Sequence, residues 1–265
     1  MSLPRTSRPF RDAALALSLL TALPVPVEWP SEERPDIAGY FPFVGLVIGS
    51  LTAVLFALAM AFGPAAESFV RSGATVFALL IVAGWAGVTR MLHWDGLADV
   101  ADGMWGSHDR SRRLEIMADP AIGAFGTTAI VFVGLAQVVG VSGILATGAV
   151  VPLVLAPVSG RLAATLGAWL GRPARPGGLG DAVAGRPRAA SAVAAALSTA
   201  IVSLLCFATL PTIPAAILVG VTLIAAPVVP HLLSRPFGGV TGDVLGASVL
   251  LTETIVLLTA ALVVS

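Results

Sequence analysis

Long apolar stretches separated by short polar segments make up most of this 265-residue chain. Those long enough to cross a bilayer core of about 30 Å as helices lie near 41–62, 73–92, 123–146, 150–170, 189–209, 212–233 and 245–264. Only a few residues around Gly148 separate the third from the fourth, and Pro211 and Pro214 mark the turn between the fifth and the sixth. The pattern predicts an all-α, polytopic membrane bundle of about seven transmembrane helices, folded as a single membrane domain over 1–265.

A shorter apolar stretch, AALALSLLTALPVP, precedes these segments and follows Arg5, Arg8 and Arg11. The arrangement is similar to the charged and apolar regions of a signal peptide. The stretch has only about a dozen residues, too few to span the bilayer core, and prolines follow it in place of a small-residue cleavage site. We expect a retained interfacial or re-entrant helix here, with a cleaved signal peptide as the alternative.

The connections between the predicted spans fall on two sides of the membrane that differ in charge. Residues 1–40, 93–122, 171–188 and 234–244 share one side, whereas 63–72 and the turns near 148 and 211 share the other. The first side carries Arg5, Arg8, Arg11, Arg34, Arg110, Arg112, Arg113, Arg172, Arg175, Arg186, Arg188 and Arg235. The second carries Arg71 alone, and almost every carboxylate lies on the first side, with Glu67 and Glu253 outside it. Because cytoplasmic loops are enriched in Lys and Arg, we expect the first side to be cytoplasmic and to hold the active face.

Composition narrows the class of protein further. Only 11% of the residues are charged and 57% are hydrophobic, against roughly 25% charged in soluble domains, so lipid must be the solvent for most of the chain. The net charge is zero, which gives no basic surface of the kind that nucleic acid requires. Cys206 is the only cysteine; this excludes a disulfide framework, and its place in an apolar run predicts a packing role.

An acidic helix is expected directly after the second span, in LHWDGLADVADG. Asp95, Asp99 and Asp102 are spaced i, i+4, i+7, which places them on one helical face. Like charges at this spacing destabilise a helix, and a bound cation removes that repulsion. Oxygen-only ligands suit a hard ion such as Mg²⁺, so these acids are candidate metal ligands. The alternative is an interfacial amphipathic helix whose acids face water.

A second acidic pair follows on the same side. Glu115 and Asp119 are spaced i, i+4, and Pro120 stops the helix behind them. Between the two acidic groups lie arginines suited to phosphate oxygens: Arg110, Arg112 and Arg113. His93, at the start of the acidic helix, could bind a metal or a phosphate, or could be a polar residue at the membrane edge.

The glycine-rich segment FGGVTGDVLGA precedes the last span, again on this side. Glycines such as Gly239 let the backbone approach a ligand closely, and a helix that starts near Thr241 offers an anion site. Asp243 has two interpretations. It is the N-cap of the last helix, or it is an acid that works beside a phosphate only when a cation bridges the two.

Arg161 and Glu253 lie deep within predicted spans, where a charge is expensive and is paired or functional. Either they pair with each other or with the backbone, or they line a polar cavity that opens to the cytoplasmic face. The loop GRPARPGGLGDAVAGRPR is either a substrate lid or a positively charged linker in which Asp181 faces water.

Four motifs stand in order along the chain: SLLTALPVP, YFPFVGLVIG, LHWDGLADVADG with RRLEIMADPAIGAFG, and FGGVTGDVLGA. In this order they resemble the cobalamin synthase family, also called the adenosylcobinamide-GDP ribazoletransferases. The resemblance implies an Mg²⁺-dependent enzyme of the bacterial inner membrane. Its implied reaction joins adenosylcobinamide-GDP to α-ribazole or its 5′-phosphate, giving adenosylcobalamin or its 5′-phosphate and releasing GMP.

The motif residues of the family carry over onto Asp95, Asp99, Asp102, Glu115, Asp119 and Asp243, whereas the roles of the individual residues are our hypothesis. Asp95, Asp99 and Asp102 are expected to hold the metal, and Asp119 or Glu115 to be the base that deprotonates the acceptor hydroxyl, with Asp102 also among the catalytic acids. The expected substrate-binding residues are Arg110, Arg112, Arg113, His93, Gly239, Thr241 and Asp243.

Two other classes of protein remain as alternatives. A membrane transporter for a polar or corrinoid compound would place binding residues near the bilayer midplane, whereas the charges here cluster at one face. A non-catalytic subunit that docks partners through its basic loops leaves the repelling aspartates unexplained. The sequence leaves open whether the chain forms a homo-oligomer or binds other cobamide-pathway enzymes.

Overall fold

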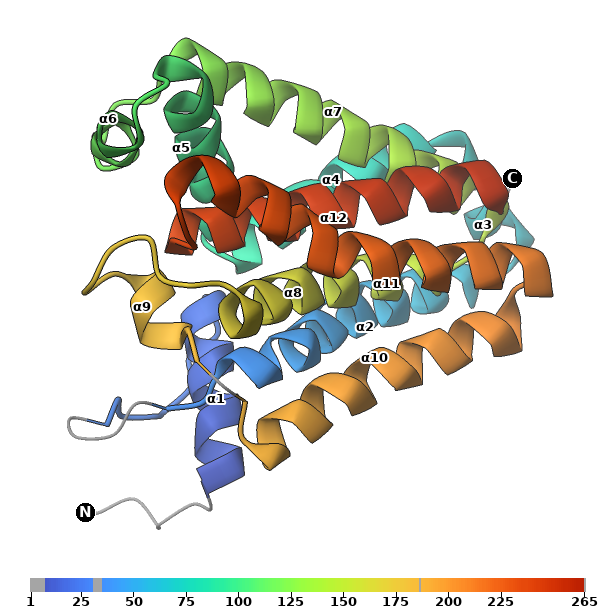
Figure 1. Ribbon diagram of the computed structural model, residues 1–265. Coiled ribbons are helices and arrows are strands. Elements are labelled where there is room, and N and C mark those ends of the chain that lie inside the picture. The colour runs from blue at the N-terminus through green and yellow to red at the C-terminus, as the bar shows by residue number, and fades with distance from the viewer. Residues whose placement is uncertain (1–7, 31–34, 186, 265) are drawn as a thin grey trace.

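The computed structural model describes residues 8–30, 35–185 and 187–264. Within them the regular elements are all helices, and the expected all-α, polytopic membrane fold is confirmed (Figure 1). The helices of membrane-spanning length are the 3₁₀ turn η1 (Ala38–Tyr40) with α2 (Phe41–Met60), α7 (Ala124–Thr147), α8 (Pro152–Leu170), α10 (Ala189–Thr209), α11 (Thr212–Ser234) with η2 (Arg235–Phe237), and α12 (Gly242–Val263). The described residues thus contain six helices that can span a membrane by length and composition.

The second predicted span, near 73–92, is shorter and broken. It forms α4 (Ala74–Val88), which meets α3 (Pro64–Ser72) at an angle of 79° across Gly73. Fifteen residues of α4 extend roughly 22 Å at 1.5 Å per residue, less than the bilayer core. The described part of the chain therefore contains a seventh candidate span only if the bent pair is counted as one.

The end of α4 is set by backbone conformation. Arg90 and Met91 have φ values of 51° and 59°, a left-handed conformation that non-glycine residues rarely adopt. The Arg90 Nη2 donates to the backbone oxygen of Ser18 at 3.1 Å, so the turn is also tied to the N-terminal helix. This turn ends the apolar helix and starts the acidic one.

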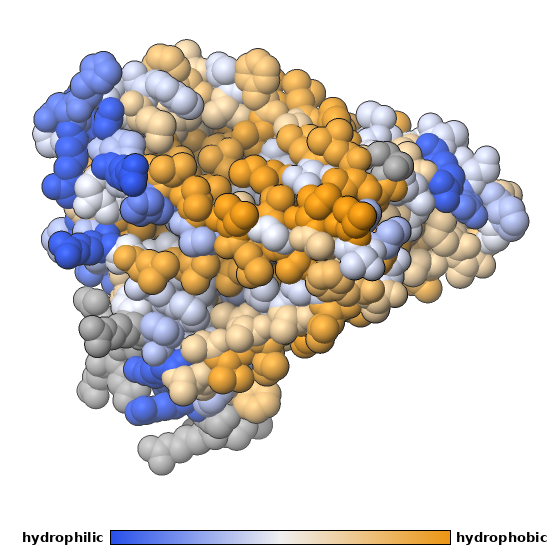
Figure 2. Space-filling model, turned by 45° about the vertical axis from the view of Figure 1, so that its right-hand side comes forward, coloured by the Kyte–Doolittle hydropathy of each residue, from blue (hydrophilic) through white to orange (hydrophobic). Residues whose placement is uncertain are grey.

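Short helices gather at one end of the bundle. They are α1 (Arg8–Leu20), α5 (Leu92–Gly106), α6 (Arg110–Ile116) and α9 (Leu179–Val183), and α1 and α5 lie across the direction of the long helices (Figure 1). Figure 2 shows hydrophilic residues at this end and a broad apolar surface along the long helices. The residues Arg5, Arg34 and Arg186 lie outside the described part of the chain.

The N-terminal helix α1 is amphipathic. Leu15, Ala16 and Leu20 are buried against the bundle, whereas Phe10 is 76% exposed. A helix that lies across the polar end of a membrane bundle with an apolar exposed residue suits an interfacial position. This geometry favours the interfacial over the re-entrant interpretation of the segment.

The centre of the bundle is formed by α8 and α12, which are buried along most of their length. Small residues bring the other helices close to them, as is usual in membranes. A Cβ at Gly45 of α2 would lie 2.4 Å from the backbone oxygen of Pro157, and one at Gly140 of α7 would lie 2.8 Å from Leu257 Cβ. Cys206 is fully buried, which confirms its expected packing role.

A buried ion pair joins the two central helices. Arg161 of α8 donates to Glu253 of α12, and their exposed fractions are 2% and 3%. Of the two interpretations of these residues, pairing with each other is the one observed. Neither lines the pocket described below.

Candidate active site

Three segments that are far apart in the sequence form one unit at the polar end. Arg110 of α6 donates from Nε to the backbone oxygen of Phe237 and from Nη2 to that of Ala174, each at 2.8 Å. The backbone nitrogen of Val240 donates to the Arg172 oxygen at 2.7 Å, and that of Ala174 donates back to Val240 at 2.9 Å. The loops predicted to share one side of the membrane are therefore in direct contact.

Two arginines of α6, Arg110 and Arg113, connect these segments through hydrogen bonds to backbone oxygens. Besides the bonds of Arg110, Arg113 donates to the backbone oxygens of Ser107 and Pro236, at 2.7 and 3.1 Å. Arg112 is exposed and pairs with Glu115 at 2.9 Å. The structure thus places none of these predicted phosphate-binding arginines in the lining of the pocket.

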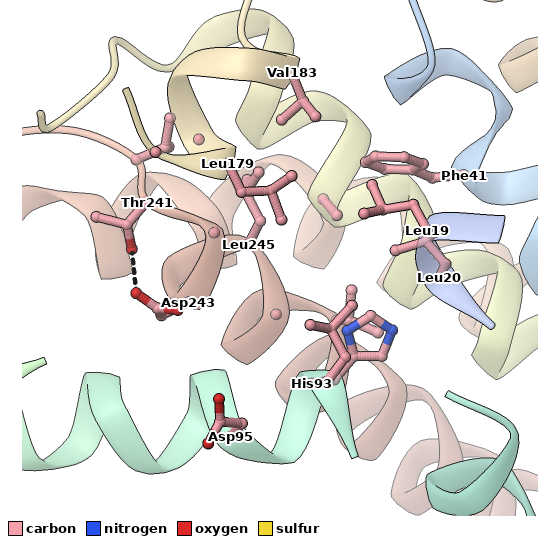
Figure 3. A pocket seen from close by; sticks show the side chains of 18 of the residues that line it. Leu19, Leu20, Phe41, His93, Asp95, Leu179, Val183, Thr241, Asp243 and Leu245 are labelled. Atoms are coloured by element: carbon pink, nitrogen blue, oxygen red, sulfur yellow. Dashed lines mark hydrogen bonds between the residues drawn. The ribbon is translucent and has the colours of Figure 1, made fainter. Parts of the chain in front are cut away.

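A pocket of about 140 Å³ opens between the start of α5, the start of α12, and α9 (Figure 3). Its polar lining consists of His93, Asp95, Arg175, Asp181, Thr241 and Asp243. Its apolar lining includes Leu19, Leu20, Phe41, Leu179, Val183 and Leu245. The acidic helix and the glycine-rich segment, separated by more than a hundred positions in the sequence, are two walls of one site.

A glycine allows these two walls to meet. A Cβ at Gly96 of α5 would lie 2.8 Å from the backbone oxygen of Asp243 and 3.0 Å from its Cα. Any larger residue here would push α5 away from the first turn of α12. The close approach brings the acids of α5 towards Asp243.

The acids at this junction repel one another. Burial raises the pKa of Asp99 to about 7, and the negative charges of Asp243, Asp95 and Asp102 act in the same direction. Asp95 is exposed and lines the pocket, while Asp99 is half-buried beside it. The expected crowding of carboxylates on one helical face is therefore observed, with Asp243 as an additional member.

Within the described residues, no group of three or more His, Cys, Asp or Glu side chains is arranged to hold a metal ion by itself. Mg²⁺ often binds through only one or two carboxylates, completing its shell with water and substrate phosphates. The carboxylates of Asp95, Asp99 and Asp243 supply hard oxygen donors whose negative charges repel one another, so the donor set fits an ion that arrives with a phosphorylated substrate.

Asp102 occupies a different environment. Its two carboxylate oxygens accept hydrogen bonds from the backbone nitrogens of Gly123 and Gly126, at 2.7 and 2.9 Å. Asp102 is buried, with an exposed fraction of 8%. These nitrogens belong to the first turn of α7, whose N–H groups have no partner within the helix. Asp102 thus caps α7 from a neighbouring helix.

Replacing Asp102 by alanine tests this role. Losing the cap is expected to lower the free energy of unfolding by about 1–2 kcal/mol, measured by denaturant unfolding in detergent. The Mg²⁺ concentration that gives half-maximal activity is expected to stay unchanged. An unchanged stability together with a raised Mg²⁺ requirement would instead make Asp102 a metal ligand, as the sequence predicts.

The start of α12 corrects one interpretation of Asp243. Thr241 is the N-cap, because its Oγ1 accepts from the backbone nitrogen of Val244 at 3.1 Å. The same hydroxyl donates to Asp243 Oδ2 at 3.3 Å. The N-cap interpretation of Asp243 is therefore wrong, and its carboxylate lines the pocket.

The glycines before Thr241, Gly238 and Gly239, shape the backbone of their loop and do not line the pocket. Gly238 has a φ of +69°, in the left-handed region, and its nitrogen donates to Arg235. The nitrogen of Gly239 donates to the Ser234 oxygen at 3.1 Å, and a Cβ there would lie 2.4 Å from the Arg172 oxygen. Gly239 therefore packs against the neighbouring loop and does not line the pocket.

Glu115 and Asp119 lie outside the pocket lining. Both are exposed; Glu115 pairs with Arg112, and Asp119 Oδ1 accepts from the backbone nitrogen of Ala121 at 2.9 Å. The structure thus separates the expected bases from the acids of α5 that face Asp243.

His93 is a buried member of the pocket lining, with an exposed fraction of 3%. Neither of its ring nitrogens has a hydrogen-bond partner among the described residues. Burial lowers the pKa of His93 well below its ordinary value, and the positive charge of Arg161 acts in the same direction. The imidazole is therefore uncharged and faces the pocket with its bonding capacity unused.

Sequence reasoning did not single out Arg175 or the apolar residues Leu19 and Leu20 as parts of the site. Arg175 lies in the loop that the sequence predicts to be a lid or a linker. Asp181 of this loop accepts from the backbone nitrogen of Gly177 at 3.1 Å. The only indication in the sequence that Arg175 belongs to the site is that its loop lies on the same side of the membrane as the acids. No signal in the sequence places the end of α1 in this wall.

Taken together, the helices and this pocket define a polytopic membrane protein with a carboxylate-lined site at its polar end. The chain belongs to the cobalamin-5-phosphate synthase family, whose model matches residues 12–261.

Three relatives are similar over most of their length, and each is named adenosylcobinamide-GDP ribazoletransferase. The relative from Chlorobium chlorochromatii (strain CaD3) is 38% identical over 256 residues, covering 94% of this chain and 95% of the relative. That from Roseiflexus sp. (strain RS-1) is 36% identical, covering 95% and 89%. That from Thermoanaerobacter pseudethanolicus is 33% identical, covering 88% and 90%. No solved structure matches the chain.

Proposed function

We propose that this protein is an Mg²⁺-dependent adenosylcobinamide-GDP ribazoletransferase. It transfers adenosylcobinamide phosphate from adenosylcobinamide-GDP to α-ribazole, the riboside of dimethylbenzimidazole, or to its 5′-phosphate. The products are adenosylcobalamin or its 5′-phosphate, and GMP. Family membership and the names of the relatives support this reaction. The observation that carries it is the pocket in which Asp95 and Asp243 from two helices face a common space beside Arg175.

The reaction is a displacement at phosphorus. A ribose hydroxyl oxygen of the acceptor bonds to the phosphorus that carries the cobinamide, and the bond from that phosphorus to the bridging oxygen breaks. GMP leaves with that oxygen. Catalysis of such a transfer depends mainly on positioning and on neutralising phosphate charge.

The geometry divides these tasks among the residues at the pocket. Asp95, exposed in the lining, accepts the proton of the attacking hydroxyl. Asp99 lies outside the lining, but its negative charge and that of Asp243 repel each other. These two acids would hold Mg²⁺, which would neutralise the phosphate charge. Arg175 and Thr241 lie where they can contact phosphate oxygens. This assignment replaces Glu115 and Asp119, which lie outside the lining.

We also place the site at the cytoplasmic face of the bacterial inner membrane. The described elements that carry most of the arginines, α1, α6 and the segment 171–188, lie at the polar end (Figure 1). Arg71 belongs to α3, at the opposite end. This asymmetry is the one that the positive-inside rule associates with a cytoplasmic face.

A transporter fits the structure less well. Its binding residues would lie midway through the bundle, but the deep charges Arg161 and Glu253 pair with each other. The polar residues that remain available line a pocket at one end.

The direct test is GMP release by the full-length protein in detergent or liposomes. Given adenosylcobinamide-GDP, Mg²⁺, and α-ribazole or its 5′-phosphate, the protein is expected to release GMP, and chelation of Mg²⁺ is expected to stop it. Asp99→Asn is expected to lower the rate by about 100-fold or more, since charge neutralisation supplies much of this catalysis. The exposed control Glu115→Gln is expected to keep near wild-type activity. Metal-independent release, or full activity of Asp99→Asn, would contradict the proposal.

A further inference from the structure

The pocket has two chemically different sides. In Figure 3 the side chains of Thr241 and Asp243 lie at one side, and His93 lies at the other, close to Leu19, Leu20 and Phe41. The first side suits phosphate and ribose. The second offers apolar side chains, one aromatic ring and a single polar group.

That polar group needs a partner. Buried polar groups in folded proteins are almost always hydrogen-bonded, yet both ring nitrogens of His93 are buried without a partner among the described residues. An uncharged imidazole presents one N–H donor and one acceptor. A ligand that lies among the apolar side chains and presents a single acceptor atom to His93 would pair its N–H.

The size of the pocket limits which part of a substrate can enter. Pockets that hold a whole drug-sized ligand measure roughly 300–1,000 Å³, whereas this one measures about 140 Å³. A corrinoid macrocycle is larger than a drug-sized molecule, so it cannot be enclosed here. A bicyclic aromatic base can.

Three such bases take part in the proposed reaction: guanine, the adenine of the adenosyl group, and dimethylbenzimidazole. Guanine and adenine carry several donors and acceptors on their edges, and most would be buried here without partners, at a large cost. Dimethylbenzimidazole in a riboside has one free ring nitrogen and is otherwise apolar. An apolar surface with a single hydrogen-bonding group matches dimethylbenzimidazole.

We propose that the apolar side of this pocket binds the base of the acceptor, and that His93 donates a hydrogen bond to its free ring nitrogen. This inference rests on the proposed function and names the substrate part that the pocket selects. Phe41 supplies an aromatic contact for the base, and such contacts favour stacked or edge-on rings. With the base at His93, the ribose lies towards Asp95, two positions further along α5.

The test compares two acceptors in the wild-type protein. One is the α-riboside of 5,6-dimethylbenzimidazole, and the other is the α-riboside of 5,6-dimethylindole, which has a CH in place of the free ring nitrogen. Losing one hydrogen bond is expected to raise KM by about 5- to 10-fold for the indole acceptor. Equal KM values for the two acceptors would overturn the proposal, and this comparison does not depend on any variant folding.

The His93→Leu variant completes the test. It is expected to raise KM for the benzimidazole acceptor by a similar factor, to leave KM for the indole acceptor nearly unchanged, and to leave KM for adenosylcobinamide-GDP unchanged. His93→Gln, which keeps an N–H donor, is expected to restore part of the preference for the benzimidazole. Equal rises for both acceptors, or a rise confined to adenosylcobinamide-GDP, would overturn it. Absence of GMP release by the wild-type protein with either acceptor would refute the proposed function itself, and this inference with it.

Discussion

Asp95→Asn is expected to lower kcat for GMP release by about 100-fold or more, the range typical of losing a general base. Asparagine has nearly the same shape as aspartate but cannot accept the hydroxyl proton. Because Asp95 is exposed in the pocket lining and makes no capping bond like that of Asp102, the variant should fold normally. The measurement is steady-state GMP release at saturating substrates, with thermal unfolding as the check on folding.

Asp119→Asn is the matched control, because the same substitution is made at an exposed acid outside the pocket lining. It is expected to retain near wild-type kcat. The reverse pattern, an active Asp95→Asn and an inactive Asp119→Asn, would return the role of base to Asp119 as the sequence predicts. It would also require the segment after α6 that carries Asp119 to move towards the pocket during the reaction.

Glu253→Leu is expected to destabilise the protein by about 3–5 kcal/mol, because it leaves a buried guanidinium without its partner. Arg161 is 2% exposed, and its paired carboxylate is Glu253 of the neighbouring central helix. Denaturant unfolding in detergent measures the change.

The double variant Arg161→Met with Glu253→Leu is the control for this pair. Replacing both charges by apolar side chains of similar size is often nearly neutral, so the double variant is expected to recover most of the lost stability. A double variant less stable than Glu253→Leu alone would show that Arg161 contributes through contacts other than the ion pair.

Much of the architecture follows from the apolar pattern, because backbone polar groups in lipid must be paired within the protein, and a helix pairs them along its own length. The long spans were predictable for that reason. The early end of the second span was not, since the turn that follows it depends on left-handed backbone at Arg90 and Met91, residues that carry no local sign of it. Pattern reasoning extended that span to residue 92, whereas α4 ends at Val88.

The candidate site was predictable only in part. Helical spacing predicted that Asp95 and Asp99 share one face of a helix. The number of predicted membrane crossings placed Asp243 on the same side of the membrane as these acids. Helical spacing also grouped Asp102 with them, although its carboxylate is engaged by α7. A side chain's distant backbone partners cannot be inferred from its spacing, and the same limit applies to Arg110 and Arg113, whose acceptors are carbonyl oxygens of other loops.

The cap that Asp102 places on α7 restricts which residues can occupy positions 123 and 126 of this chain. A Cβ at Gly123 or Gly126 would lie 2.4 Å from a carboxylate oxygen of Asp102, a distance at which one of the two must move. Aspartate is already the shortest acidic side chain, so it cannot retreat to make room. A larger residue at position 123 or 126 would therefore displace the Asp102 carboxylate from its two backbone donors unless residue 102 became smaller at the same time.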